Sequence, residues 1–106
     1  YEEKENTMSK KYDVKIEVLS IARPCGSGMQ VGDTCYCERT DGLGLRFRGT
    51  DGWCPELVHA AMPALSSLAF GGELPWEDEQ GRATSACPDP HCQVVIGVSR
   101  LRESEK

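Results

Sequence analysis

Apolar and polar residues alternate along four stretches of the chain, and this alternation predicts strands. Between Tyr12 and Ile21 the apolar side chains of Val14, Ile16 and Val18 alternate with charged residues. A period of two places such apolar side chains on one face of a half-buried strand. The same pattern predicts further strands at 31–38, 43–48 and 93–102, with a hairpin turn at Asp41-Gly42 between two of them.

One stretch follows a helical period instead. From about residue 55 to residue 70 the apolar residues recur at roughly 100° per residue, which places them on one side of a helix. Pro55 suits the first helical position, where its missing N–H is harmless. Gly71-Gly72 indicates the helix end. Pro63 is expected to kink or shorten the helix. The apolar side is expected to comprise Leu57, Val58, Ala61, Met62, Leu65, Leu68 and Ala69.

The order of these elements indicates an α+β fold rather than a doubly wound parallel one. We expect a small mixed or antiparallel sheet of three to five strands, with one main helix at about 55–70 packed across it. The chain of 106 residues has room for one core. A single domain is predicted over 12–102, with a flexible tail at 1–11 and a short tail at 103–106. Residues 73–92 are rich in turn formers and are predicted to be irregular.

Charge and hydropathy narrow the classes of partner. A formal net charge of −5 argues against nucleic acid and anionic membranes, which attract a basic surface. No apolar run approaches the roughly 20 residues that span a bilayer. The N-terminal residues lack the apolar stretch of a signal peptide, so a cytoplasmic location is predicted. Because a core of this size is marginal alone, a homo-oligomer or a subunit of a larger redox enzyme is a further expectation.

The six cysteines are the unusual part of the composition. Without an export signal, free thiols, metal ligands or redox groups are favoured over a disulfide framework. Cys54 stands at or next to the helix N-cap, where unpaired N–H groups and the helix dipole stabilise a thiolate. It is therefore a candidate metal ligand or catalytic nucleophile. The alternative is a small buried cysteine that only caps the helix.

Two further cysteines stand in loops whose backbone is restricted by proline and glycine. Cys87 begins the stretch CPDPHC, and Cys25 lies between Pro24 and Gly26. Residues from separate loops and a helix start commonly converge in small folds, so Cys25, Cys54 and Cys87 form one candidate ligand set. Cys92 or His91 is the candidate fourth ligand. No spacing matches a standard metal signature, because the chain has no C-x-x-C.

Other polar residues have simpler explanations. Cys35 and Cys37 point to one face of a predicted strand, where packing as small apolar residues explains them better than metal ligation. His59 lies five residues after Cys54, about 140° away around the helix, and is interpreted as a helix-flank histidine. The acidic run Glu77-Asp78-Glu79 is interpreted as solvated rather than as a cation site.

The chain resembles a family of small prokaryotic proteins of unknown function that is frequent in anaerobes. The resemblance rests on the motifs VGD, G-x-CP, FGGE-x-PW and ACPDP, in this order over most of residues 12–102. It implies that Cys25, Cys54 and Cys87 occupy the cysteine positions of the family. In that family a histidine often precedes the VGD step, where this chain has Met29-Gln30. The stretch 38–51 is longer than usual, which favours an extra hairpin.

Three functional hypotheses follow. The first is a metal-binding or iron–sulfur protein in which Cys25, Cys54 and Cys87 hold a zinc ion or three irons of a [4Fe–4S] cluster, with a role in redox or electron-transfer chemistry. The second is a thiol-based redox or catalytic domain with Cys54 as nucleophile and Cys87 as resolving thiol. The third is a non-catalytic interaction or oligomerisation module with inert cysteines. The sequence identifies no substrate and no reaction.

Overall fold

The fold is known from a computed structural model that describes residues 12–24, 26, 28–40, 44–88 and 90–101. The predicted tails at 1–11 and 103–106 lie outside these residues. The described elements are, in chain order, strands β1 (Asp13–Ile21), β2 (Thr34–Arg39) and β3 (Leu45–Arg48), helix α2 (Pro55–Ala69), and strands β4 (Arg82–Ala86) and β5 (Val94–Leu101).

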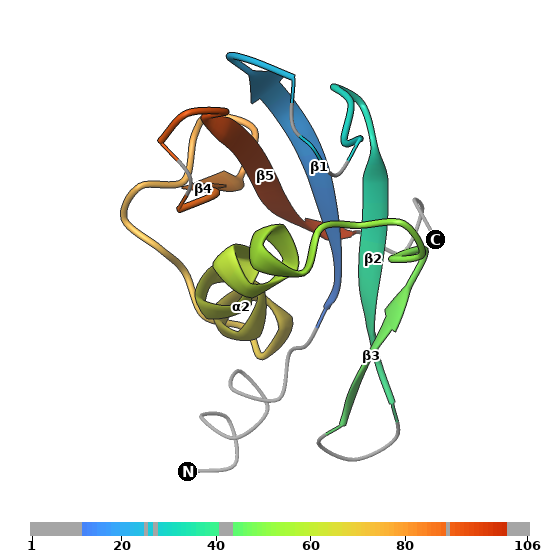
Figure 1. Cartoon of the computed structure of the whole chain (residues 1–106). Coiled ribbons are helices and arrows are strands. Elements are labelled where there is room, and N and C mark those ends of the chain that lie inside the picture. The colour runs from blue at the N-terminus through green and yellow to red at the C-terminus, as the bar shows by residue number, and fades with distance from the viewer. Residues whose placement is uncertain (1–11, 25, 27, 41–43, 89, 102–106) are drawn as a thin grey trace, which may run out of the picture.

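The five strands form one antiparallel sheet in the order β3-β2-β1-β5-β4. Helix α2 lies across one face of this sheet (Figure 1). The central strand is therefore β1, which lies between β2 and β5, although β5 is the last described strand in the chain. This arrangement confirms the predicted α+β fold, in its antiparallel form.

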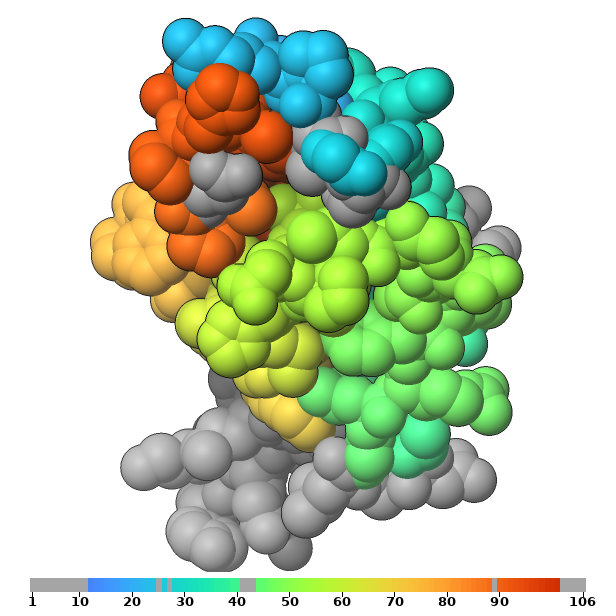
Figure 2. Space-filling model, in the orientation of Figure 1, coloured from blue at the N-terminus to red at the C-terminus, as the bar shows by residue number. Residues whose placement is uncertain are grey.

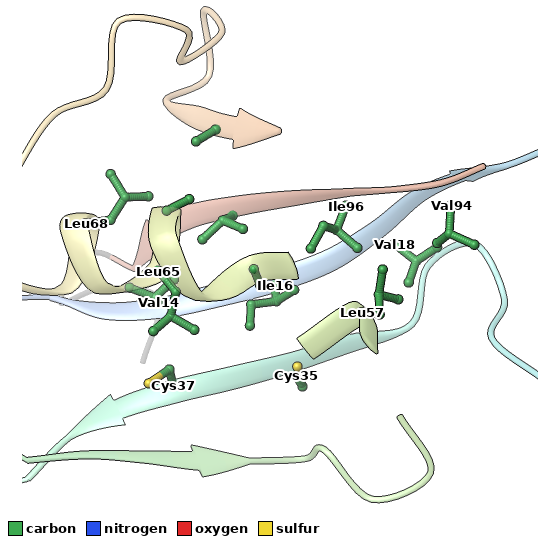
Figure 3. Close-up of a cluster of buried hydrophobic side chains, with 14 of the residues drawn as sticks. Val14, Ile16, Val18, Cys35, Cys37, Leu57, Leu65, Leu68, Val94 and Ile96 are labelled. Atoms are coloured by element: carbon green, nitrogen blue, oxygen red, sulfur yellow. The ribbon is translucent and has the colours of Figure 1, made fainter. Parts of the chain in front are cut away.

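The core lies between α2 and the sheet. Along β1 the side chains of Val14, Ile16 and Val18 are fully buried, whereas the residues between them are partly exposed. Figure 3 shows these side chains facing Leu57 and Leu65 of the helix. The apolar face of β1, formed by every second residue, thus packs against the apolar side of α2, as the sequence predicts. The other fully buried or nearly buried members of this cluster are Met29, Cys35, Cys37, Ala61, Ala64, Leu68, Ala69, Ala83, Cys92, Val94, Ile96 and Val98.

Helix α2 begins and ends where the sequence predicts. Pro55 is its first residue, and the helix continues through Pro63 to Ala69 without being shortened there. At its end the N–H of Gly72 donates to the Ser67 carbonyl and that of Gly71 to the Leu68 carbonyl, which is the Schellman arrangement. Gly71 has a φ of 90°, a conformation that favours glycine.

The predicted apolar side of α2 is corrected at three residues. Met62 is 36% exposed, and Val58 is only partly buried. Ala64, which the prediction omitted, is buried. The helix therefore presents a narrower, alanine-containing stripe to the sheet, and the long Met62 side chain lies on its outer side.

Strand β4 is a second correction, because residues 73–92 were predicted to be irregular. Arg82–Ala86 pairs with β5 at the edge of the sheet. Only Ala83 of this strand is buried. An edge strand with a single buried alanine has almost no hydrophobic alternation, and its pairing with β5 supplies the stabilisation instead.

The acidic run before β4 is also corrected, because two of its members are paired rather than simply solvated. Glu77 forms an ion pair with Arg100 of β5, and both side chains are mostly buried. Asp78 accepts hydrogen bonds from the backbone of Gln80 and from the backbone and side chain of Arg82. These contacts anchor the connection between α2 and β4 to the sheet.

The sheet face opposite α2 is largely polar in the described residues. The Arg48 guanidinium lies over the Tyr36 ring, 4.3 Å from its centroid, and Nε donates to Glu38 at 2.7 Å. Lys15 pairs with Glu17 on the same face. An antiparallel sheet commonly leaves one such face to water. No helix in the described part of the chain has both the length and the apolar character that a membrane span requires.

Candidate functional site

The structure separates the described cysteines into two groups. Cys35 and Cys37 lie in β2 and point into the core. Cys54, Cys87 and Cys92 lie in connections at one end of the sheet, and Cys25 lies outside the described residues. Within the second group Cys54 and Cys87 are partly exposed, whereas Cys92 is buried like the two cysteines of β2.

Cys35 and Cys37 act as small apolar residues. Cys35 is 0% exposed and Cys37 is 1% exposed, and both pack against the side chains beneath α2. Burial, and secondarily the neighbouring Cys37, raises the pKa of Cys35 to about 12. Burial also raises the pKa of Cys37. Because the thiolate is the nucleophile and the ligand, these two thiols are poor candidates for either role.

Cys54 is the N-cap of α2, as predicted. Its backbone is extended, with φ −65° and ψ 125°, and its carbonyl accepts hydrogen bonds from the N–H groups of Leu57 and Val58 at 3.1 and 3.2 Å. Its side chain makes no capping hydrogen bond. The residue is partly exposed and packs against the core. Only the backbone of Cys54 therefore caps the helix, and the sulfur is not engaged in that role.

Cys87 directly follows β4. Its N–H donates to the Val94 carbonyl at 2.9 Å, which continues the antiparallel ladder by one residue beyond the strand. Like Cys54, it is partly exposed and packs against the core. The ladder thus fixes the backbone position of Cys87 before Pro88 turns the chain away.

Cys92 connects two loops. Its carbonyl accepts hydrogen bonds from the N–H groups of Ala22 and Arg23 at 2.9 and 3.2 Å. Its thiol donates to the Pro24 carbonyl, with Sγ to O at 3.6 Å, and its side chain is 6% exposed. Nη1 of Arg23 donates to the carbonyl of His91 at 2.9 Å. The start of the β1–β2 connection is thereby bound to the β4–β5 connection.

These segments gather at one end of the molecule. Figure 2 shows the end of β1, the β4–β5 connection and the first turns of α2 adjoining one another on one face. In the core beneath them, Leu57 of α2 lies at the same end as Val18 of β1 and Val94 of β5 (Figure 3). The elements that carry Cys54, Cys87 and Cys92 therefore adjoin at one end of the molecule, whereas the predicted convergence of Cys25, Cys54 and Cys87 stays a prediction, because Cys25 lies outside the described residues.

The described residues do not by themselves form a metal site with three ligands. No group of three His, Cys, Asp or Glu side chains that can hold a metal ion occurs among residues 12–24, 26, 28–40, 44–88 and 90–101. The set Cys25, Cys54 and Cys87 is outside this test, because Cys25 is not described. His59 is exposed on α2, in agreement with the interpretation of it as a flank residue.

Sequence reasoning did not predict the structural roles of Arg23 and Met29. Met29 is 6% exposed and joins the core, although it lies in a loop rich in glycine and proline. It also lines an open hollow of about 460 Å³ beside the end of β1, together with Ile21, Ala22, Arg23, Pro24, Gly28, Gln30 and Val31. Neither residue belongs to a periodic pattern, so nothing in the sequence indicates that the loop folds back onto the sheet.

Comparison of the chain with protein-family models, with curated proteins and with solved structures finds no match. The resemblance to the small prokaryotic family therefore stays a prediction.

Proposed function

We propose that this protein binds a metal ion or an iron–sulfur cluster through thiols at the end of the sheet where β1 ends and β5 begins. The proposed ligands are Cys25, Cys54 and Cys87, with Cys92 or His91 as the fourth. We place this function in the cytoplasm, where thiols stay reduced. A role in electron transfer or other redox chemistry, alone or as a subunit of a larger enzyme, follows from a bound cluster.

The division of the cysteines carries this proposal. Cys35 and Cys37 are buried, whereas Cys54 and Cys87 are partly exposed at one end of the fold. Packing accounts for the first pair. It accounts less well for the second, because the Cys54 sulfur makes no capping bond and a partly exposed thiol gains little by burial.

Three thiols with one further ligand are donors that suit two kinds of metal centre, although Cys54, Cys87 and either Cys92 or His91 form no three-ligand group among the described residues. Three thiolates with one further ligand form a common tetrahedral zinc site. Three thiolates also hold three irons of a [4Fe–4S] cluster, whose fourth iron is then open to a small ligand. In both cases Cys54 would be supplied by the N-cap position of α2.

A second candidate function is thiol chemistry without a metal. Cys54 stands at the start of α2, its side chain makes no capping hydrogen bond, and the residue is partly exposed. In this alternative Cys54 is the nucleophile and Cys87 forms a disulfide with it, after an external disulfide or peroxide has oxidised Cys54. A third alternative, an interaction module with inert thiols, predicts neither metal nor a fast-reacting cysteine.

The first experiment measures metal content and visible absorbance of protein purified without oxygen. Roughly three to four irons per chain with broad absorption near 400 nm support a cluster, and about one zinc without colour supports a zinc site. Absence of both metals overturns the proposal. Rapid alkylation of Cys54 in the metal-free protein then supports the thiol alternative, and uniformly slow alkylation supports the interaction module.

Single variants then assign the ligands. Cys25→Ala, Cys54→Ala and Cys87→Ala are each expected to lower metal content, because a missing ligand opens the coordination shell. Cys37→Ala is the matched control, since it removes a thiol that is buried in the core. Equal metal loss in all four variants would indicate general unfolding, which circular dichroism detects independently.

A further inference from the structure

We infer that Arg23 is a positioning residue that holds the start of the β1–β2 connection against the β4–β5 turn and thereby sets the geometry around Cys92. Arg23 lies after β1, and His91 and Cys92 lie just before β5. The two segments are 68 residues apart in the sequence, and several hydrogen bonds join them.

The contacts run between named atoms. The N–H groups of Ala22 and Arg23 both donate to the Cys92 carbonyl, at 2.9 and 3.2 Å. Nη1 of Arg23 donates to the His91 carbonyl at 2.9 Å. In the reverse direction the Cys92 thiol donates to the Pro24 carbonyl at 3.6 Å. Three consecutive residues of one connection thus contact two consecutive residues of the other.

Among these contacts, the Arg23 side chain supplies the one that substitution removes most cleanly. The backbone bonds from Ala22 and Arg23 survive any substitution except proline. The guanidinium is a charged donor, so its bond to a carbonyl is stronger than a neutral one. Arg23 itself is exposed, and its replacement leaves the core beneath α2 unchanged.

The consequence for Cys92 is protection of its thiol. Its side chain is only 6% exposed although it lies in a turn between two exposed neighbours, His91 and Gln93. With the connection held in place, a reagent reaches Cys92 only when the two segments separate. Loss of the Arg23 bond makes this local opening more frequent, and alkylation through the open state accelerates in proportion.

The test compares Arg23→Ala with wild type by pulsed iodoacetamide labelling of metal-free protein, read by mass spectrometry at each cysteine. We expect Cys92 to react roughly two- to tenfold faster in the variant, the range that one hydrogen bond produces. Cys54 and Cys35 are expected to keep their rates. Arg23→Lys restores part of the protection, because an ammonium group can donate to the same carbonyl. Arg46→Ala, which removes an exposed arginine from β3, is the matched control.

A second measurement addresses the proposed metal site. If Cys92 or His91 is a ligand, Arg23→Ala also weakens Co²⁺ binding by a similar factor, read from the sulfur-to-cobalt absorption band, and Arg23→Lys restores part of it. This arm rests on the proposed function, whereas the labelling arm does not. If neither wild type nor any variant binds Co²⁺ while Cys92 still labels faster in Arg23→Ala, the metal function alone is overturned. An unchanged Cys92 rate in Arg23→Ala overturns the positioning role.

Discussion

The guanidinium of Arg100 and the carboxylate of Glu77 face each other through two parallel hydrogen bonds, of 2.8 and 2.9 Å. The same guanidinium donates to the Gly72 carbonyl at 2.7 Å, and the Leu74 N–H donates to the Glu77 carboxylate at 2.7 Å. This pair therefore fixes the segment after α2 onto β5. It gives the FGGE-x-PW motif a structural role that is independent of any metal.

Glu77→Gln is expected to lower the free energy of unfolding by about 1–2 kcal/mol at pH 7, because a charge-assisted bidentate pair is lost. The hydrogen bond from Arg100 holds the pKa of Glu77 below its ordinary value of 4.5. The contribution of Glu77 is therefore fully present above that value and disappears as the pH falls through the lowered pKa.

Urea unfolding of Glu77→Gln and wild type, at pH 7 and at successively lower pH, measures this difference. The two proteins are expected to converge in stability under acid conditions. Glu79→Gln serves as the control, since Glu79 is exposed in the same acidic run. A difference that persists unchanged below the pKa of Glu77 would contradict the ion pair as its source.

The two glycines after α2 are expected to resist substitution for different reasons. A Cβ at Gly72 would lie 2.6 Å from Ser67 Oγ and 3.0 Å from the Ser67 carbonyl oxygen, whereas Gly71 has a positive φ. We expect Gly71→Ala and Gly72→Ala each to cost about 1–2 kcal/mol in thermal or urea unfolding. Gly26→Ala, where a Cβ meets nothing within 4 Å, is the control. Equal stability of all three variants would sink the explanation.

Cysteine reactivity is expected to follow burial. With the pKa of Cys35 at about 12 against an ordinary 9.0, its thiolate fraction near pH 8 is about a thousandfold lower than that of an unperturbed thiol. Cys54 and Cys87 should therefore label before Cys35 and Cys37 in native protein, and the difference should vanish in denaturant.

Because the folded pKa of Cys35 is raised, its protonated form favours folding below pH 9, and this stability is lost as the pH rises toward 12. Early labelling of Cys35 in folded protein would refute its burial.

Leu65 and Met62 provide a test of which side of α2 faces the sheet. Leu65→Ala is expected to cost 2–5 kcal/mol, the usual range for a fully buried leucine. Met62→Ala is expected to change stability by less than about 0.5 kcal/mol, because Met62 is partly exposed. Similar losses in both variants, measured by urea unfolding, would place Met62 in the core.

The elements that the sequence predicted well are those with strong periodicity. The alternation of Val14, Ile16 and Val18 and the apolar spacing of α2 each determine one buried face, whatever the neighbours are. β4 has one buried residue, Ala83, and owes its position to pairing with β5. Hydrogen-bonded pairing between distant segments does not show in the local hydrophobic pattern, so the pattern did not predict this strand.

The candidate site was predictable in part. The position of Cys54 at the N-cap follows from Pro55 and the helical period, and the burial of Cys35 and Cys37 follows from their strand. The ion pair of Glu77 with Arg100 and the contact of Arg23 with His91 join residues 23 and 68 positions apart. Such pairs depend on the sheet order, which single-sequence patterns do not determine.

The pairing of β1 with β5 also determines how much of the chain must be synthesised before the sheet can be completed. Asp13 and Leu101 are register partners, so β1 can pair with β2 early but cannot complete its pairing with β5 until almost the whole described chain has left the ribosome. Contacts of such large sequence separation slow folding. Any nascent chain that stops before Val94 leaves the edge of β1 opposite β2 without a partner strand. Because β4 also pairs with β5, such a chain leaves β4 without its partner as well.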